Sequence, residues 1–127
     1  MKIGLVLEGG GMRTLFTAGV LDAFLDKHIE VNGVVGVSAG ALFGVNYISK
    51  QKERSVRYNK KYSNEKKYMG FYSWITTGNA VNKDFAFYDL PFNLDPFDQN
   101  EFEKSHIDFY LTVTNIENGR AEYFKIK

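Results

Sequence analysis

The first 50 residues alternate between short apolar runs and segments with helical spacing. The apolar runs cover residues 3–7 and 33–37, and each ends at a turn that contains glycine. A continuous apolar run of this length is typical of a strand buried on both faces of a parallel sheet. Residues 15–27 and 39–50 follow the two runs with helical spacing. The pattern therefore predicts a β-α-β-α order in which a right-handed crossover makes the two strands parallel neighbours.

Both predicted helices carry recognisable packing features. The first contains Phe16, Val20 and Phe24 on one stripe and Asp22 and Asp26 on the polar side. We expect the apolar stripe to face the core. The second helix begins with small residues, which let it pack closely beneath the turn that precedes it.

Beyond residue 50 the composition changes twice. Residues 50–67 hold eight basic and two acidic side chains. We interpret them as a solvated helix face with Tyr58 and Tyr62 directed toward the core, and the alternative is attraction of anionic lipid head groups. Residues 68–103 are aromatic and weakly periodic, which predicts short helices and loops. Ordinary core aromatics are the favoured interpretation there, and a lid over an acyl-chain pocket is the alternative.

The end of the chain has the pattern of a hairpin. Residues 109–114 alternate between apolar and polar side chains, and a second run covers residues 121–126. The dipeptide Asn118-Gly119 lies between them. An antiparallel pair of strands is therefore predicted.

Composition and charge limit the class of protein. The chain has 127 residues, 44% of them hydrophobic and 16% aromatic, so one globular domain over residues 1–127 is expected. A net charge of +1 gives no general attraction to nucleic acid. The lack of cysteine excludes disulfides and thiolate metal sites, and we expect neither a metal nor a cofactor. The first apolar run is too short for a signal peptide or a membrane span, so a soluble cytoplasmic protein is expected.

The second apolar run ends at a Gly-x-Ser-x-Gly pentad centred on Ser38. Its other members are Gly36, Val37, Ala39 and Gly40. A strand that stops at this motif and leads directly into a helix is the context of a nucleophile elbow, a sharp turn that lifts the serine hydroxyl clear of the backbone. Ser38 is therefore a candidate nucleophile, although the same pentad also occurs by chance in chains without catalysis.

A second glycine turn follows the first apolar run. It contains Gly9, Gly10, Gly11, Met12 and Arg13. Consecutive glycines allow backbone N–H groups to point into a shared space, and the N-terminus of a following helix favours an anion there. Parallel neighbouring strands would place this loop and the serine turn at the same edge of the sheet. The loop then predicts an oxyanion hole beside the serine.

The motifs G-L-V-L-E-G-G-G-M-R and G-V-S-A-G resemble the start of a patatin-like phospholipase domain of bacterial type. The resemblance implies a three-layer α/β fold with a mostly parallel central sheet. It also implies a serine acyl hydrolase of lipid esters, such as a phospholipase A, that works through a Ser-Asp dyad. Carried over by position, Ser38 is the nucleophile and residues 9–13 form the oxyanion hole. The implied partner is a lipid or acyl-ester substrate, with peripheral contact to membrane lipid.

Two positions depart from the family pattern. The family loop usually ends in Arg-Gly, whereas Thr14 follows Arg13 here, and a threonine can instead cap the helix. The family's aspartate lies in a later Asp-Gly-Gly or Asp-Gly-Ala motif, and no Asp-Gly dipeptide occurs in the 127 residues. We therefore expect the N-terminal part of a longer domain, truncated at its C-terminus and weakly active or inactive by itself. Such a truncated sheet would expose an edge and an apolar face, so self-association is expected.

Two further function classes stay open beside the acyl hydrolase. One is a nucleotide- or phosphate-binding module that uses the glycine loop. Gly9-x-Gly11-x-x-Thr14 lacks the third glycine of the dinucleotide fingerprint, which weakens this interpretation. The other is a non-catalytic fragment or assembly module that keeps the fold without the base.

The two histidines are the remaining candidates for a base. His28 lies at the end of the first predicted helix, where a cation is favourable without any catalytic role. His106 is the alternative partner for Ser38, with Asp98 or Asp108 to orient it. An α/β-hydrolase with a Ser-His-Asp triad normally has several strands before its nucleophile elbow. Only one predicted strand precedes the elbow in this sequence, which disfavours such a triad.

Overall fold

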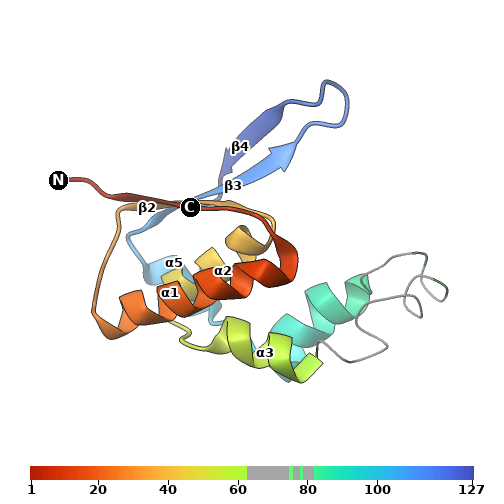
Figure 1. Ribbon diagram of the computed structural model, residues 1–127, viewed down its shortest axis with the longest axis horizontal. Coiled ribbons are helices and arrows are strands. Elements are labelled where there is room, and N and C mark those ends of the chain that lie inside the picture. Colours follow the sequence, from red (N-terminus) through yellow and green to blue (C-terminus); the bar gives the residue numbers. More distant parts are fainter. Residues whose placement is uncertain (63–74, 76–77, 79–81) are drawn as a thin grey trace. The chain divides into compact units, whose positions relative to one another are not determined.

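The computed structural model describes residues 1–62, 75, 78 and 82–127. The chain divides into two compact units, which are described separately (Figure 1). The first unit contains Met1–Ser55 and Asp98–Lys127, and the second contains Val56–Phe97. Both glycine motifs belong to the first unit, so its sheet and helices position the candidate site.

A four-stranded sheet in the order β1-β2-β3-β4 forms the centre of the first unit. Its strands are β1 (Gly4–Leu7), β2 (Gly33–Val37), β3 (Asp108–Thr114) and β4 (Ala121–Lys125). The first three strands are parallel, and β4 is antiparallel to β3. The predicted α/β class with a mostly parallel sheet is therefore confirmed.

The helices of the first unit lie on one side of this sheet. They are the 3-10 turn η1 (Gly11–Thr14), α1 (Leu15–Asp26), α2 (Ala39–Ile48) and α5 (Gln99–Lys104). Figure 1 shows α1, α2 and α5 below the strands, as right-handed crossovers between parallel strands in this order require. Helix α2 packs across β1, β2 and β3, and α1 packs against α2. The two helices predicted in the first 50 residues are confirmed.

The core lies between α2 and the inner face of the sheet. Val34 and Phe109, which are paired in the register of β2 and β3, are both buried. Gly44 lets α2 approach closely, because a Cβ at this position would lie 3.0 Å from Leu7 Cδ1 and 3.2 Å from Val34 Cγ1. The ring of Phe102 in α5 packs edge-on against Phe109, with 6.1 Å between the ring centroids. The interdigitation is that of a well-packed interior.

No described helix of the first unit covers the outer face of the sheet. Val6 is 70% exposed although it lies in the middle of β1, and Val37 and Tyr123 are also exposed. The prediction that both apolar runs are buried on two faces is therefore wrong for the described part of the chain. The physical reason is the strand order, since every described crossover of this unit brings its helices to the inner face. Of the expected three layers, the described residues build two.

Helix α1 turns a different face to the core from the one predicted. Phe16 is 80% exposed and Val20 is also exposed, whereas Ala18 and Leu21 are buried. Of the predicted stripe, Phe24 alone is partly buried, and it contacts the Tyr47 ring edge-on. The prediction was wrong because α1 packs against α2, and a small side chain such as that of Ala18 permits a close helix contact.

The second unit contains most of α3 (Arg54–Tyr62) and the π-helical segment η2 (Phe85–Leu94). Tyr62 is buried and packs edge-on against Phe85, with 5.5 Å between the ring centroids. Tyr58 is buried as well, so the predicted core orientation of the two tyrosines is confirmed. The Arg57 guanidinium donates two hydrogen bonds of 2.8 and 2.9 Å to the Asp95 carboxylate, which links α3 to the end of η2.

Among the members of the basic run that the structure describes, Arg54 is not solvated. Lys50 and Lys52 are exposed and form ion pairs with carboxylates, as a solvated face allows. Arg54 is instead buried and donates a 2.8 Å hydrogen bond to Asn46 Oδ1. A polar acceptor inside the first unit thus offsets the desolvation of the guanidinium. Residues 63–74, 76–77 and 79–81, which include part of the predicted lid and of the basic run, lie outside the described residues.

The predicted C-terminal hairpin is confirmed. Asn115 N donates to Arg120 O at 2.8 Å, and Arg120 N donates to Asn118 Oδ1 at 2.8 Å. Gly119 has a φ of 69°, in the left-handed region that glycine adopts without strain. The Asn-Gly pair therefore has the role that the sequence indicated.

Ile48 is a direct test of this core because its side chain is 1% exposed. We expect Ile48→Ala to lower the free energy of unfolding by about 2–5 kcal/mol, since removal of a buried aliphatic group leaves a cavity. Ile116, which is 97% exposed, is the matched control, and Ile116→Ala should change stability by less than about 0.5 kcal/mol. Urea unfolding followed by circular dichroism measures both, and equal losses would contradict this core.

Candidate active site

The two glycine motifs meet at the carboxyl edge of the parallel sheet. Leu7, the last residue of β1, is paired with Gly36 of β2. The chain leaves β1 at Glu8 and β2 at Ser38, so both turns emerge at the same edge. In open α/β sheets this edge is where ligands bind. The predicted arrangement of the first 50 residues is therefore confirmed.

Ser38 has an unusual backbone conformation. Its φ is 51° and its ψ is −124°, which is a strained region for a residue with a side chain. Ser38 directly precedes α2, and its side chain makes no capping hydrogen bond to that helix. The residue is exposed, and its hydroxyl has no hydrogen-bond partner among the residues that the structure describes. The turn between β2 and α2 therefore leaves the Ser38 hydroxyl exposed and without a structural hydrogen bond to the described residues.

The glycines on either side of Ser38 are required by backbone contacts. A Cβ at Gly36 would lie 2.5 Å from Ala41 Cα, and one at Gly40 would collide with the carbonyl oxygens of Leu7 and Glu8. Backbone atoms of a strand and a helix cannot move aside as a flexible side chain can. The small residues of the pentad are thus explained by the close approach of α2 to the end of β1.

The glycine loop lies directly beside Ser38. A Cβ on Gly9 would be 3.1 Å from Ser38 Cβ and 3.4 Å from Val37 O. Gly11 has a φ of 55°, and Arg13 N donates to Gly10 O at 3.2 Å to begin η1. The amides that precede this first bond have no partner within the helix. The loop therefore has backbone donors available close to the serine turn.

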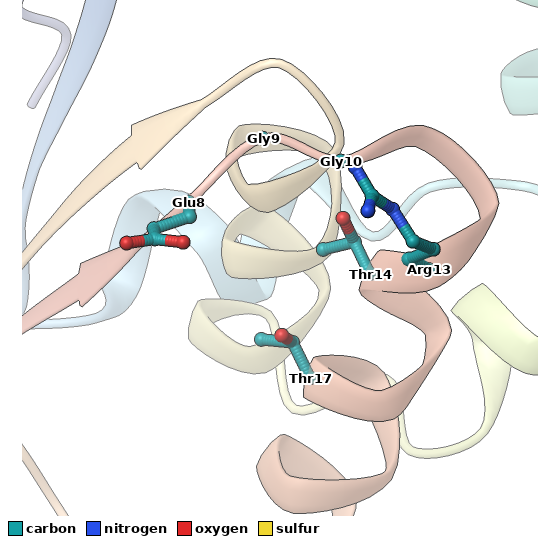
Figure 2. A pocket seen from close by; sticks show the side chains of 6 residues that line it. All are labelled: Glu8, Gly9, Gly10, Arg13, Thr14 and Thr17. Carbon is teal, nitrogen blue, oxygen red and sulfur yellow. The ribbon is translucent and has the colours of Figure 1, made fainter.

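A pocket of about 330 Å³ opens at this loop (Figure 2). Its lining residues are Glu8, Gly9, Gly10, Arg13, Thr14 and Thr17. Figure 2 shows the Arg13 side chain directed back toward Gly10. Ser38 is not among the lining residues, so the pocket adjoins the serine turn through Gly9 and does not contain it.

The polar residues of this pocket include three that the sequence reasoning did not assign to the site. They are Glu8, Thr14 and Thr17. Thr14 is buried, and its Oγ1 lies 3.0 Å from where a Cβ of Gly10 would be. It stands at the N-cap of α1 as expected, but its hydroxyl makes no capping bond, so the predicted capping role is wrong. The departure from the family's Arg-Gly pattern was the sequence signal that marked this position.

Both histidines lie at the opposite edge of the sheet. His28 precedes β2 and His106 precedes β3, and the register pairs the first residues of these strands, Gly33 and Asp108. Ser38 follows the other end of β2, about 13 Å further along at 3.3 Å per residue. This topology does not bring either histidine to the serine turn, and the alternative of His106 with Asp108 is not supported.

Fold and site together define a mostly parallel α/β protein with a glycine turn and a strained serine turn at one sheet edge. Over residues 5–123 the chain matches the family described as Patatin-like phospholipase. Because this match covers most of its length, the chain belongs to the patatin-like phospholipase family, a family of lipid hydrolases.

Individual relatives are similar at low identity. Lysophospholipase nte1 of Aspergillus niger is 28% identical over 96% of this chain, and the protein of the same name in Emericella nidulans is 30% identical over 95%. The chain spans 8% of the length of each of these relatives. The uncharacterized protein YjjU of Escherichia coli is 32% identical over 65% of this chain and 24% of its own length.

The backbone contacts around the serine turn can be tested with two glycine substitutions. Gly40→Ala should lower the free energy of unfolding by at least about 1–3 kcal/mol, because its Cβ meets two carbonyl oxygens. Gly19→Ala is the control, since Gly19 lies within α1 and nothing stands within 4 Å of its Cβ position. That variant should gain about 0.5–1 kcal/mol from helix propensity. Thermal unfolding of both proteins measures the difference, and a neutral Gly40→Ala would contradict the close approach.

Proposed function

We propose that the protein is a serine acyl hydrolase of lipid esters in which Ser38 is the nucleophile. The observation that carries this proposal is the strained backbone of Ser38, with its hydroxyl exposed beside the glycine loop. Strain at a non-glycine residue costs about 1–3 kcal/mol and persists where the surrounding structure enforces it, often at functional sites. The family membership and the printed names of the lysophospholipase relatives support lipid esters as the substrate class.

The proposed chemistry begins with attack of Ser38 Oγ on the ester carbonyl carbon. A general base accepts the hydroxyl proton and passes it to the alcohol, which leaves as the C–O bond breaks. Water then attacks the acyl-enzyme, the fatty acid is released, and Ser38 Oγ recovers a proton. The negative charge on the carbonyl oxygen would be held by amides of the loop from Gly10 to Met12. Gly9 and Arg13 complete the proposed oxyanion loop, and Val37 and Ala39 complete the proposed nucleophile elbow with Gly36 and Gly40.

The general base is proposed to be an aspartate that the 127 residues do not contain. No Asp-Gly dipeptide occurs in this sequence, and the lysophospholipase relatives are far longer than the matched segment. Without a positioned base, catalysis falls by roughly 10²–10⁴. The 127-residue chain is accordingly proposed to be a weak esterase.

Hydrolysis of p-nitrophenyl butyrate tests this assignment with three proteins. They are this chain, a longer protein that continues the same sequence through an Asp-Gly motif, and the longer protein with Ser38→Ala. We expect turnover from the longer protein, a rate lower by roughly 10²–10⁴ from the short chain, and loss of activity on Ser38→Ala. Retained activity in the Ser38→Ala protein would sink the nucleophile assignment, and full activity in the short chain would show that the base lies within residues 1–127.

A serine-directed fluorophosphonate probe supplies the matched control. Ser105 is a second serine in the first unit, and its hydroxyl already accepts the Ile107 amide at 3.2 Å. Labelling of the longer protein should disappear in Ser38→Ala and persist in Ser105→Ala. A melting shift with nucleotides in the absence of labelling would instead favour a phosphate-binding module.

We further propose that the protein self-associates through the uncovered outer face of its sheet. Val6, Val37 and Tyr123 are exposed on this face, and contiguous apolar surface of this kind favours association. Light scattering at micromolar concentration should show a mass that rises with concentration, and Val6→Lys with Tyr123→Lys should restore a monomer. Ile116→Lys, on the exposed hairpin turn, is the control that should leave association unchanged. A monodisperse monomer of the unaltered chain would contradict this proposal.

A further inference from the structure

The pocket beside the glycine loop has one buried polar side chain in its lining, that of Thr14. The residue is 5% exposed (Figure 2). Its hydroxyl makes no capping hydrogen bond to α1 and has no other hydrogen-bond partner among the residues that the structure describes. A buried polar group without a partner is rare in proteins and calls for an explanation, such as a functional role or a bound molecule. Of the groups in this lining, the Thr14 hydroxyl therefore gains most from a ligand.

The glycine loop keeps this hydroxyl accessible. Figure 2 shows the Thr14 oxygen directed toward Gly10, and a Cβ on Gly10 would lie only 3.0 Å from Thr14 Oγ1. A threonine in a helix often donates to the carbonyl oxygen four residues earlier. For Thr14 that oxygen is Gly10 O, which instead accepts the Arg13 amide at 3.2 Å. The absence of a side chain at Gly10 thus leaves the hydroxyl both unbonded and open to the pocket.

The two charged residues of the lining are of opposite sign. Glu8 and Arg13 are both exposed, and neither forms an ion pair with the residues that the structure describes. One carboxylate and one guanidinium give the lining no net charge, so it selects neither an anion nor a cation. Exposed charges also contribute little to binding because water screens them. Recognition by this pocket therefore depends on its neutral polar groups, the hydroxyls of Thr14 and Thr17.

A ligand hydroxyl fits these groups. A threonine hydroxyl can donate one hydrogen bond and accept others, and an alcohol can do the same in return. Thr17 follows Thr14 by three residues, which places it on the same side of the helix, and it adds a second hydroxyl to the lining. A methyl group at this place would displace water without restoring its hydrogen bonds, and affinity would be lost. The pocket therefore favours a hydroxyl over a methyl group of similar size.

The position of the pocket relates it to the alcohol part of an ester. It adjoins the serine turn through Gly9, whose Cβ would lie 3.1 Å from Ser38 Cβ. None of the six lining residues has an aliphatic or aromatic side chain, so the pocket does not suit an acyl chain. In the proposed reaction the alcohol is attached to the carbonyl carbon that Ser38 attacks. Its next carbons can then reach past Gly9 toward Thr14.

We propose that Thr14 determines specificity by binding a free hydroxyl on the alcohol part of the ester. The protein then prefers partial esters of polyols to esters of simple alcohols. The inference rests on the proposed function for the reaction, whereas binding of the hydroxyl itself needs no catalysis. The glycine that is usual at this position in the family has no side chain to make this contact, so the assignment concerns this chain in particular.

Two esters that differ in a single group test this preference. 2-Hydroxyethyl butyrate has a hydroxyl where propyl butyrate has a methyl group. In the longer protein with its Asp-Gly motif, kcat/KM should be at least about tenfold higher for the hydroxy ester, after division by the relative rates of alkaline hydrolysis. Thr14→Val should bring this ratio close to one, and Thr14→Ser, which keeps the hydroxyl, should retain most of it. Thr114→Val is the matched control, because Thr114 is exposed in β3 and does not line the pocket.

Binding is measured separately in the 127-residue chain with Ser38→Ala, which leaves the esters intact. In NMR titrations the Thr14 amide signal should respond to the hydroxy ester at a concentration at least about fivefold lower than to propyl butyrate. Inorganic phosphate is the third ligand and should give the weakest response, because Glu8 opposes an anion. Among the described residues no helix has the length and apolar character needed to cross a membrane, and the titrations are run in buffer without detergent.

An unchanged ratio in the Thr14→Val protein would overturn the proposal, and so would equal binding of the two esters. A stronger response to phosphate than to the hydroxy ester would also overturn it, because the pocket would then be an anion site. We expect Thr14→Val to fold, since it replaces an unpartnered hydroxyl with a group of the same shape. The comparison of the two esters with Thr14 in place does not depend on that variant. Selective binding of the hydroxy ester without esterase activity in the longer protein would refute the proposed function and leave the assignment of Thr14 standing.

Discussion

The close backbone contact between the start of α2 and the end of β1 is the constraint on which this site depends. Gly40 lies against the carbonyl oxygens of Leu7 and Glu8, and Gly36 lies against Ala41. Because these contacts join backbone to backbone, no side chain can be accommodated between them. They hold Ser38 in its strained conformation and bring it beside Gly9. The proximity of the two turns therefore follows from packing of the fold and needs no attraction between the turns themselves.

Strand order decides which groups can take part at this edge. The sheet runs β1-β2-β3 in parallel, so the residues that leave each strand gather at one edge and those that enter gather at the other. Ser38 and the glycine loop leave strands, whereas both histidines precede them. The proposed oxyanion loop and the candidate nucleophile thus share an edge that neither histidine reaches. This separation keeps both histidines away from Ser38, and the missing Asp-Gly dipeptide is the reason that the proposed base is sought outside the 127 residues.

The same strand order also exposes apolar surface. All described helices of the first unit cover the inner face, so Val6 and Tyr123 meet solvent on the outer face. Helix α1 is held through Ala18 and Leu21, and Phe16 is left outward. Two separate apolar surfaces result, one on the sheet and one that begins at the glycine loop.

The sequence by itself determined the order of the elements in the first 50 residues, the parallel pairing of β1 and β2, the C-terminal hairpin and the two glycine motifs. These features depend on local propensity and on glycine, whose effects are short-range along the chain. The family resemblance rested on the same two motifs. The tertiary structure decided which face of α1 is buried and at which edge of the sheet the histidines lie. It also decided that Arg54 is buried beside Asn46 and that the Thr14 hydroxyl does not cap its helix. Helical periodicity identifies an apolar stripe but not its partner, because burial is set by contacts between residues distant in the sequence.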